Sequence, residues 1–198
     1  MYTNISGRPL DSPEFYPFYE MAEKYDVPIH LHPTHPPAQG QRKYELEYKL
    51  PIIFGWPFET SIAIGRIVFS GLLEKFPNLK IITHHLGGMI PFLEARIDGV
   101  SEEGMEEIAD KRILSKKPME YFKRIYYDTA TCGSMPALEC AHKVIGPDQI
   151  LFGTDYPFGP EDAEKWVRQT LHSIQKSELP NDSKNKILGE NANRLFRQ

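Results

Sequence analysis

The stretch Val27-Pro28-Ile29-His30-Leu31-His32-Pro33 is a short apolar run that carries two histidines and ends at a proline. Such runs, bounded by turn-forming residues, are typical of buried strands, so a strand is predicted over residues 27–32. Side chains repeat every second residue along a strand, which places the rings of His30 and His32 on the same face. By themselves, the two histidines fit either hydrogen-bonded core residues or metal ligands.

The pattern on either side of this stretch alternates between strands and helices. Further strands are predicted over residues 79–83, 125–129 and 149–154, with a short one at 2–5. Helices are predicted over residues 13–22, 57–72, 90–97, 105–108, 135–145 and 160–174, and at the end of the chain near Phe196. This alternation predicts an α/β fold with a mostly parallel sheet. Four or five strands fit an open doubly wound sheet or part of a (β/α)8 barrel, which needs eight strands and typically about 250 residues.

The composition is that of an ordinary globular protein. The chain has 198 residues, 40% of them hydrophobic and 25% charged, and a formal net charge of −4, which gives no global attraction to nucleic acid or anionic membrane. No apolar run approaches the roughly 18 residues of a membrane span, and the first residues lack a signal-peptide pattern. Cys132 and Cys140 cannot form a disulfide framework. We therefore expect a single domain over residues 1–198, in the cytoplasm, with neither nucleic acid nor membrane as a partner.

The residues that suggest chemistry follow the predicted strands. His32, the pair His84-His85 and Asp155 each lie at the carboxyl end of a strand, where parallel α/β folds gather their active sites. His32, His85 and Asp155 are therefore expected to converge. Imidazole and carboxylate are suitable ligands for zinc or a similar divalent ion. Neighbouring strand residues point to opposite faces, so at most one of His84 and His85 is expected to reach the site. His35 is expected to be solvated, and His142 and His172 to have packing or surface roles on helices.

Other residues have two interpretations. Trp56 and Phe58 could form the wall of an apolar pocket, or simply belong to a helix start in which Glu59 lies near the positive end of the dipole. Arg96 is either a surface residue or an anion-binding group, since guanidinium binds carboxylate with two hydrogen bonds. For Asp128, which ends the third of the four main strands, a structural hydrogen-bonding role is favoured over a catalytic one. Gly87-Gly88 favours a tight turn over a phosphate cradle.

Taken in order, these segments resemble the amidohydrolase-related family, specifically its aminocarboxymuconate-semialdehyde decarboxylase-like branch. The matching segments are residues 6–11, 28–33, 56–60, 76–80, 85–88, 127–130, 153–157 and 191–196. They are spread along essentially the whole chain, which the match therefore covers.

The resemblance implies a metal-dependent (β/α)8 TIM barrel, of which this chain holds the C-terminal part with about four to five of eight strands. It implies that His32, on the fifth barrel strand, is a metal ligand, and that Asp155, after the eighth, is both a ligand and an acid–base group. His85, after the sixth strand, resembles the catalytic histidine. Arg96 matches a position that binds the substrate carboxylate from a neighbouring subunit, and Trp56 is expected to contact substrate. Zinc is the expected metal, with manganese as the alternative.

The chain departs from the family pattern at its beginning. The family's first strand carries its own His-x-His with two more metal ligands, and no counterpart precedes Met1. His32 and Asp155 alone give two protein ligands, whereas catalytic zinc sites normally have three. The missing strands would also leave barrel edges unpaired, and such edges favour association. A homo-oligomer, or a partner chain that supplies the missing strands, is therefore expected.

The resemblance also implies the reaction. Residues 56–60 favour non-oxidative decarboxylation of a small aromatic or unsaturated carboxylic acid. One alternative is metal-dependent hydrolysis within the same superfamily. The other is an inactive half barrel that needs a partner chain.

Overall fold

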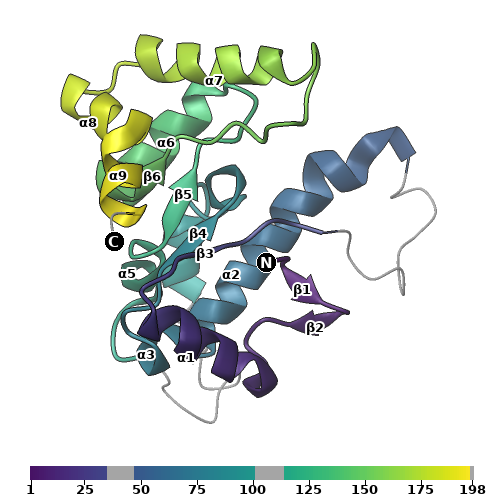
Figure 1. Ribbon diagram of the computed structural model, residues 1–198, viewed down its shortest axis with the longest axis vertical. Coiled ribbons are helices and arrows are strands. Elements are labelled where there is room, and N and C mark those ends of the chain that lie inside the picture. The colour runs from purple at the N-terminus through teal and green to yellow at the C-terminus, as the bar shows by residue number, and fades with distance from the viewer. Residues whose placement is uncertain (35–46, 101–113, 197–198) are drawn as a thin grey trace.

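The computed structural model describes residues 1–34, 47–100 and 114–196 (Figure 1). Within these ranges the main sheet has four strands, β3 (Ile29–His30), β4 (Ile81–Thr83), β5 (Tyr126–Asp128) and β6 (Ile150–Leu151). They lie in the order β3-β4-β5-β6, and every neighbouring pair is parallel. The predicted α/β fold with a parallel sheet is confirmed. His35 and the helix predicted over residues 105–108 lie outside the described residues.

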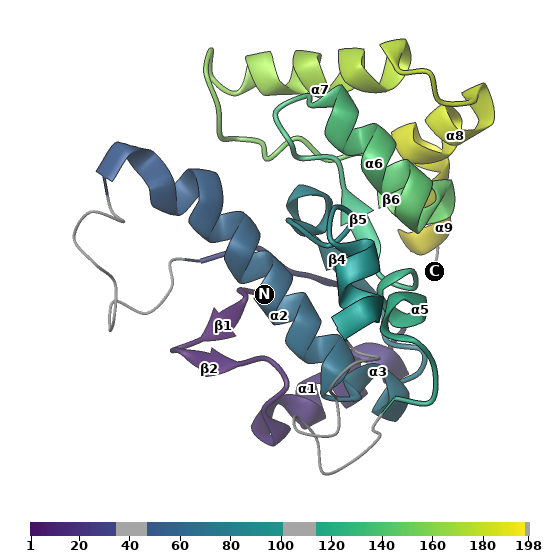
Figure 2. The same ribbon diagram turned by 180° about the vertical axis from the view of Figure 1, so that it is seen from behind.

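Helices connect the strands and gather at the two ends of the sheet (Figures 1 and 2). At the β3 and β4 end lie α1 (Tyr16–Lys24), α2 (Trp56–Phe69), α3 (Leu72–Lys75) and α5 (Pro118–Phe122), with a further helical segment over residues 94–100. At the β6 end lie α6 (Met135–Ile145), α7 (Glu164–Lys176), α8 (Asn181–Asn185) and α9 (Asn191–Phe196). Shorter helical turns are Pro13–Phe15, Pro51–Gly55, His85–Gly87, Pro147–Gln149 and Lys186–Glu190.

Helix α7 starts later than the sequence predicts. Its first residue is Glu164 and not Pro160, because Glu161, Asp162 and Ala163 have φ values of 57°, 52° and 74°. A right-handed helix cannot include residues with positive φ.

The first three residues extend the sheet beyond β3. The amino group of Met1 donates to the carbonyl of His30 (2.8 Å), and His32 N–H donates to the carbonyl of Met1 (2.9 Å). Thr3 N–H donates to the carbonyl of His32 (3.1 Å). The short strand predicted at residues 2–5 is therefore divided: residues 1–3 pair with β3, whereas β1 (Asn4–Ile5) forms an antiparallel hairpin with β2 (Arg8–Pro9).

The two faces of the parallel sheet differ in chemistry. One face packs into the main core through buried residues that alternate along the strands: Ile29, Leu31, Ile81, Tyr127 and Ile150. Burying each large apolar side chain contributes about 1.5–3 kcal/mol relative to leaving it exposed. The residues between them point to the opposite face. They include His30, His32, His84 and Asp128, so the packing of the core fixes which face carries the polar side chains.

Helix α2 continues a longer helical run. By length and composition alone, residues Glu47–Phe69 could cross a membrane, a feature that the sequence expectations miss. The core helix of a soluble protein passes the same test. Ala63, Ile64, Ile67 and Val68 pack into the main core, whereas the beginning of the run is exposed at residues 52–54. The second half of the run thus behaves as a core helix.

Asn191 ties α9 to β6 and provides a test of the fold. Its side chain is fully buried, and its Nδ2 donates to the carbonyls of Pro147 (2.7 Å) and Ile150 (2.8 Å). Asn191→Leu leaves both carbonyls unpaired, which is expected to cost about 1–3 kcal/mol for each in the free energy of unfolding. Asn193→Leu, at an exposed position of the same helix, is the control and is expected to change stability by less than about 0.5 kcal/mol. Urea denaturation measures both; equal stability of the two variants would contradict the assigned role of Asn191.

Candidate metal and acid–base site

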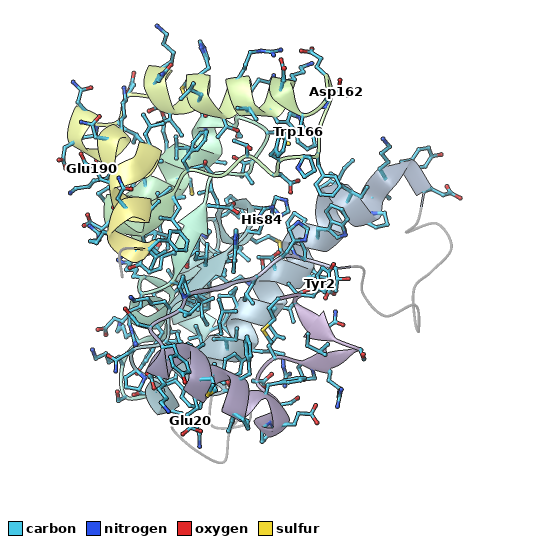
Figure 3. All side chains as sticks on the ribbon, viewed as in Figure 1. Tyr2, Glu20, His84, Asp162, Trp166 and Glu190 are labelled. Atoms are coloured by element: carbon cyan, nitrogen blue, oxygen red, sulfur yellow. The ribbon has the colours of Figure 1, made fainter. Side chains whose placement is uncertain are left out.

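His84 lies at the centre of a cluster at the carboxyl ends of the strands (Figure 3). The strand register explains this position. Thr83 pairs with Tyr127 and His30 with Ile82, so continuing each ladder brings His84 beside Asp128 and His32 beside His84. The ring centroids of His32 and His84 are 4.6 Å apart.

The imidazole of His84 bridges two carboxylates. Its Nε2 donates to Asp155 Oδ1 (3.0 Å), and its Nδ1 lies 2.5 Å from Asp128 Oδ2. Burial favours the neutral ring, but the two carboxylates outweigh burial and raise the pKa of His84 to about 9. His84 is thus a buried ring with a carboxylate on each side.

His85 reaches the same site, and the prediction that only one of the two histidines would do so is wrong. His84 still has extended backbone angles, but His85 has a φ of 53°, so the alternation of faces stops there. The two rings stand 4.1 Å apart, and His85 Nε2 is 3.9 Å from Asp155 Oδ2. Burial lowers the pKa of His85, an effect that the contact with Asp155 opposes and the neighbouring His84 charge reinforces. Its buried Nδ1 has no hydrogen-bond partner among the described residues.

Asp155 faces three imidazoles. In addition to the contacts with His84 and His85, its Oδ1 lies 3.6 Å from His32 Nε2. Burial raises the pKa of Asp155, but the hydrogen bonds from the three histidines outweigh burial and hold the pKa well below its usual range. Asp155 has a φ of 66°, so it shares positive φ with His85. Such strained residues cost about 1–3 kcal/mol each and cluster at functional sites.

Asp128 has the structural role that the sequence favours. Its Oδ1 accepts hydrogen bonds from the backbone N–H groups of His85 (2.9 Å) and Ala130 (3.1 Å), while Oδ2 faces His84 and His30. Burial opposes ionisation of Asp128, yet its hydrogen bonds with His30, His84 and Ala130 keep its pKa well below the usual range. The carboxylate therefore fixes both the turn at His85 and the ring of His84.

The glycine pair after His85 makes a close turn, as the sequence favours. A Cβ on Gly87 would lie 2.5 Å from Tyr127 Cε1, and one on Gly88 would lie 2.3 Å from the carbonyl oxygen of Pro57. Both glycines also have positive φ. The turn thus packs directly against β5 and the first turn of α2.

The donor set fits a divalent metal. Ligand atoms of His32, His84 and Asp155 all lie within 4.8 Å of one another, and a second group of this kind joins His30, His84 and Asp128. Imidazole and carboxylate are ligands of zinc and of manganese.

The other predicted residues divide into those near the cluster and those away from it. The Trp56 ring lies 6.2 Å from the His32 ring, whereas Phe58 is exposed to solvent. Arg96 is exposed on segment 94–100 and, within the described ranges, makes none of the site's hydrogen bonds or ion pairs. His142 and His172 have the packing and surface roles expected of them: His142 Nε2 lies 3.0 Å from Ser183 Oγ, and His172 is exposed.

The sequence interpretation gives no site role to His84 or His30, although both join these donor groups. The sequence signal that could have predicted a site position for His84 is the pair Gly87-Gly88, which marks a sharp turn at the end of the strand. A turn of this kind breaks the two-residue alternation and allows consecutive histidines to reach one site.

Comparison with known proteins places this geometry in a family. The family model described as amidohydrolase matches residues 2–198. The chain belongs to the amidohydrolase family. The resemblance seen in the sequence is thereby confirmed.

Among the relatives of this amidohydrolase is 2-amino-3-carboxymuconate-6-semialdehyde decarboxylase of Dictyostelium discoideum, which is 31% identical over 192 residues, 96% of this chain and 50% of the relative. The crystal structure of 5-carboxyvanillate decarboxylase from Sphingomonas paucimobilis superposes with a TM-score of 0.85 at 32% identity, over 100% of this chain and 58% of that chain. The crystal structure of a dihydroxybenzoic acid decarboxylase from Polaromonas, with bound manganese and 2-nitroresorcinol, superposes with a TM-score of 0.79 at 30% identity. The match covers 96% of this chain and 55% of that chain. The amidohydrolase chain spans about half the length of the curated relatives it matches.

The glycine turn gives a test of the site's geometry. Gly88→Ala forces a Cβ against Pro57 at a positive φ, and is expected to lower the free energy of unfolding by about 2–5 kcal/mol. Gly65→Ala, inside α2 with open space around its Cβ, is the matched control and is expected to raise it by about 0.5–1 kcal/mol. Thermal and urea unfolding measure both changes. A Gly88→Ala protein as stable as the wild type would mean that the turn does not pack as described.

Proposed function

We propose that this amidohydrolase forms part of a metal-dependent active site that decarboxylates an aromatic or unsaturated carboxylic acid without oxidation. The convergence of His32, His85 and Asp155 at one edge of the sheet carries the proposal. The decarboxylase names of the relatives support the choice of reaction over hydrolysis.

His32 and Asp155 are the residues assigned to hold the metal. When bound, the metal supplies positive charge that orients and polarises oxygen atoms of the substrate. Zinc is proposed first because imidazole and carboxylate ligands suit it. The manganese in the Polaromonas decarboxylase makes manganese the alternative.

His85 and Asp155 are assigned to move the proton. In decarboxylation the bond between the substrate carbon and its carboxylate breaks, carbon dioxide leaves, and a proton taken from solvent and passed on by His85 or Asp155 takes its place on that carbon. His85 Nε2 and Asp155 Oδ2 lie 3.9 Å apart, so both can face the same substrate carbon. The side chains of His85 and Asp155 are only 17% and 13% exposed, which limits competing proton exchange with water.

Trp56 and Arg96 are assigned to substrate binding. Trp56, half-buried beside His32, offers an apolar wall for the substrate's carbon skeleton. Arg96 is exposed and lies away from the histidine and aspartate cluster of its own chain. This position suits a guanidinium that binds the substrate carboxylate in a neighbouring subunit.

Association with a second copy or a partner chain is part of the proposal. The described parallel sheet has four strands plus residues 1–3, and a closed barrel has eight. The start of the long helical run exposes Ile52, Ile53 and Phe54. An open sheet edge and exposed apolar side chains are both features that association covers.

A reduced cytoplasmic setting is proposed as well. Cys132 and Cys140 are free, with Cys132 exposed to solvent. Exposed free thiols are typical of proteins in reducing compartments.

The reaction can be tested by carbon dioxide release. The metal-loaded chain, combined with a polypeptide that supplies the remaining barrel strands, is incubated with 2,6-dihydroxybenzoate and 5-carboxyvanillate. Release is expected, and His85→Gln or Asp155→Asn is expected to reduce it by at least about 100-fold, because each removes a proton-transfer group. His172→Gln, at an exposed position on α7, is the control and is expected to retain full activity.

Two outcomes would contradict the assignment. Hydrolysis of ester or amide substrates without carbon dioxide release would favour the hydrolase alternative. Full activity in His85→Gln would remove that residue from the chemistry.

A further inference from the structure

His84 has no part in the mechanism above, although it is the most enclosed imidazole of the cluster. Its side chain is 7% exposed, compared with 35% for His32 and 17% for His85. Its Nε2 forms a hydrogen bond with Asp155 Oδ1, whereas its buried Nδ1 lies 2.5 Å from Asp128 Oδ2 without the geometry of a hydrogen bond. Burying such polar atoms is costly unless they are used.

We propose that His84 is a third protein ligand, so that His32, His84 and Asp155 together bind the divalent metal. The inference rests on the proposed function only in requiring a metal at this site. It goes beyond the resemblance, which assigns His32 and Asp155 alone.

The donor distances support this set. His84 Nε2 is 3.0 Å and His32 Nε2 is 3.6 Å from the same oxygen, Asp155 Oδ1. Ligands about 2.0–2.2 Å from a tetrahedral zinc ion are separated by roughly 3.3–3.6 Å. The three donors therefore need small side-chain adjustments, and His84 Nε2 must release the proton it shares with Asp155, to accept an ion between them.

The other nitrogen of His84, Nδ1, lies beside a carboxylate, the kind of partner that metal-binding histidines use. Ligating histidines almost always donate their second N–H to a carboxylate or carbonyl, which fixes the ring and its tautomer. His84 Nδ1 faces Asp128 Oδ2 at 2.5 Å, and Asp128 is itself held by the backbone N–H groups of His85 and Ala130. This arrangement directs Nε2 towards Asp155 and His32.

Two neighbouring arrangements fit less well. In the second donor group, His84 Nδ1 and Asp128 Oδ2 are 2.5 Å apart, further below the separation of two ligands of one ion than the 3.0 Å between His84 Nε2 and Asp155 Oδ1. His30, the third member of that group, is exposed on the sheet surface. His85 Nε2 lies 3.9 Å from the other oxygen of Asp155 and is not part of either donor group.

The consequence is that the 198-residue chain has three protein ligands of its own, the usual number for a catalytic zinc site. Metal binding by this chain then requires no ligand from a partner, even where catalysis requires partner strands.

Zinc titration of the metal-free chain by calorimetry tests the inference. The wild type is expected to bind one equivalent, and His84→Gln to bind at least about 100-fold more weakly, more than the 10–100-fold typical of losing an outer-shell partner. Asp128→Asn is expected to weaken binding by about 10–100-fold. His172→Gln removes an exposed histidine and is expected to bind like the wild type. Circular dichroism establishes that each variant is folded.

X-ray absorption of the zinc-loaded wild-type chain provides a measurement that needs no variant. Two imidazole ligands are expected, from His32 and His84. A single imidazole, or equal zinc affinity in folded His84→Gln and wild type, would overturn the inference and leave the proposed pair His32 and Asp155 intact. Absence of zinc binding by the wild-type chain would also overturn it, whereas carbon dioxide release by the completed barrel tests the proposed function separately.

Discussion

Alternate side chains of the parallel strands point to opposite faces, and the site depends on that constraint. Ile29 and Leu31 are buried in the core, which forces His30 and His32 onto the other face. The same alternation places Ile81 in the core and, with the extended backbone of His84, directs that ring to the face of His32. Apolar burial thereby determines the direction of the imidazoles before any metal or substrate is involved.

Charge pairing then determines how these side chains can coexist. Two carboxylates next to each other would repel, but the ring of His84 lies between Asp128 and Asp155 and contacts both, which offsets part of that repulsion. Asp128 in turn holds the backbone N–H of His85 in a turn with positive φ. The strained backbone at His85 and Asp155 is therefore supported by hydrogen bonds and ion pairs within the same cluster.

The position of the cluster at the carboxyl edge of the sheet explains how four described strands can carry it. The clustered side chains of His32, His84 and Asp155 follow β3, β4 and β6, so a short parallel sheet is sufficient to bring them together. Enclosing a substrate requires additional polypeptide around the cluster. The exposed apolar start of the long helical run and the edge formed by residues 1–3 are the places where additional polypeptide can complete the wall.

The sequence by itself determined the order and approximate position of the strands, because apolar runs and turn-forming residues are local properties. It also predicted that His32, His85 and Asp155 lie close together, since motifs at strand ends can be read along the chain. Only the tertiary structure decided that His84 joins them and that Arg96 lies apart. The φ of 53° at His85 is a backbone choice stabilised by Asp128, 43 residues away. The start of α7 at Glu164 was likewise decided by backbone angles that residue spacing does not specify.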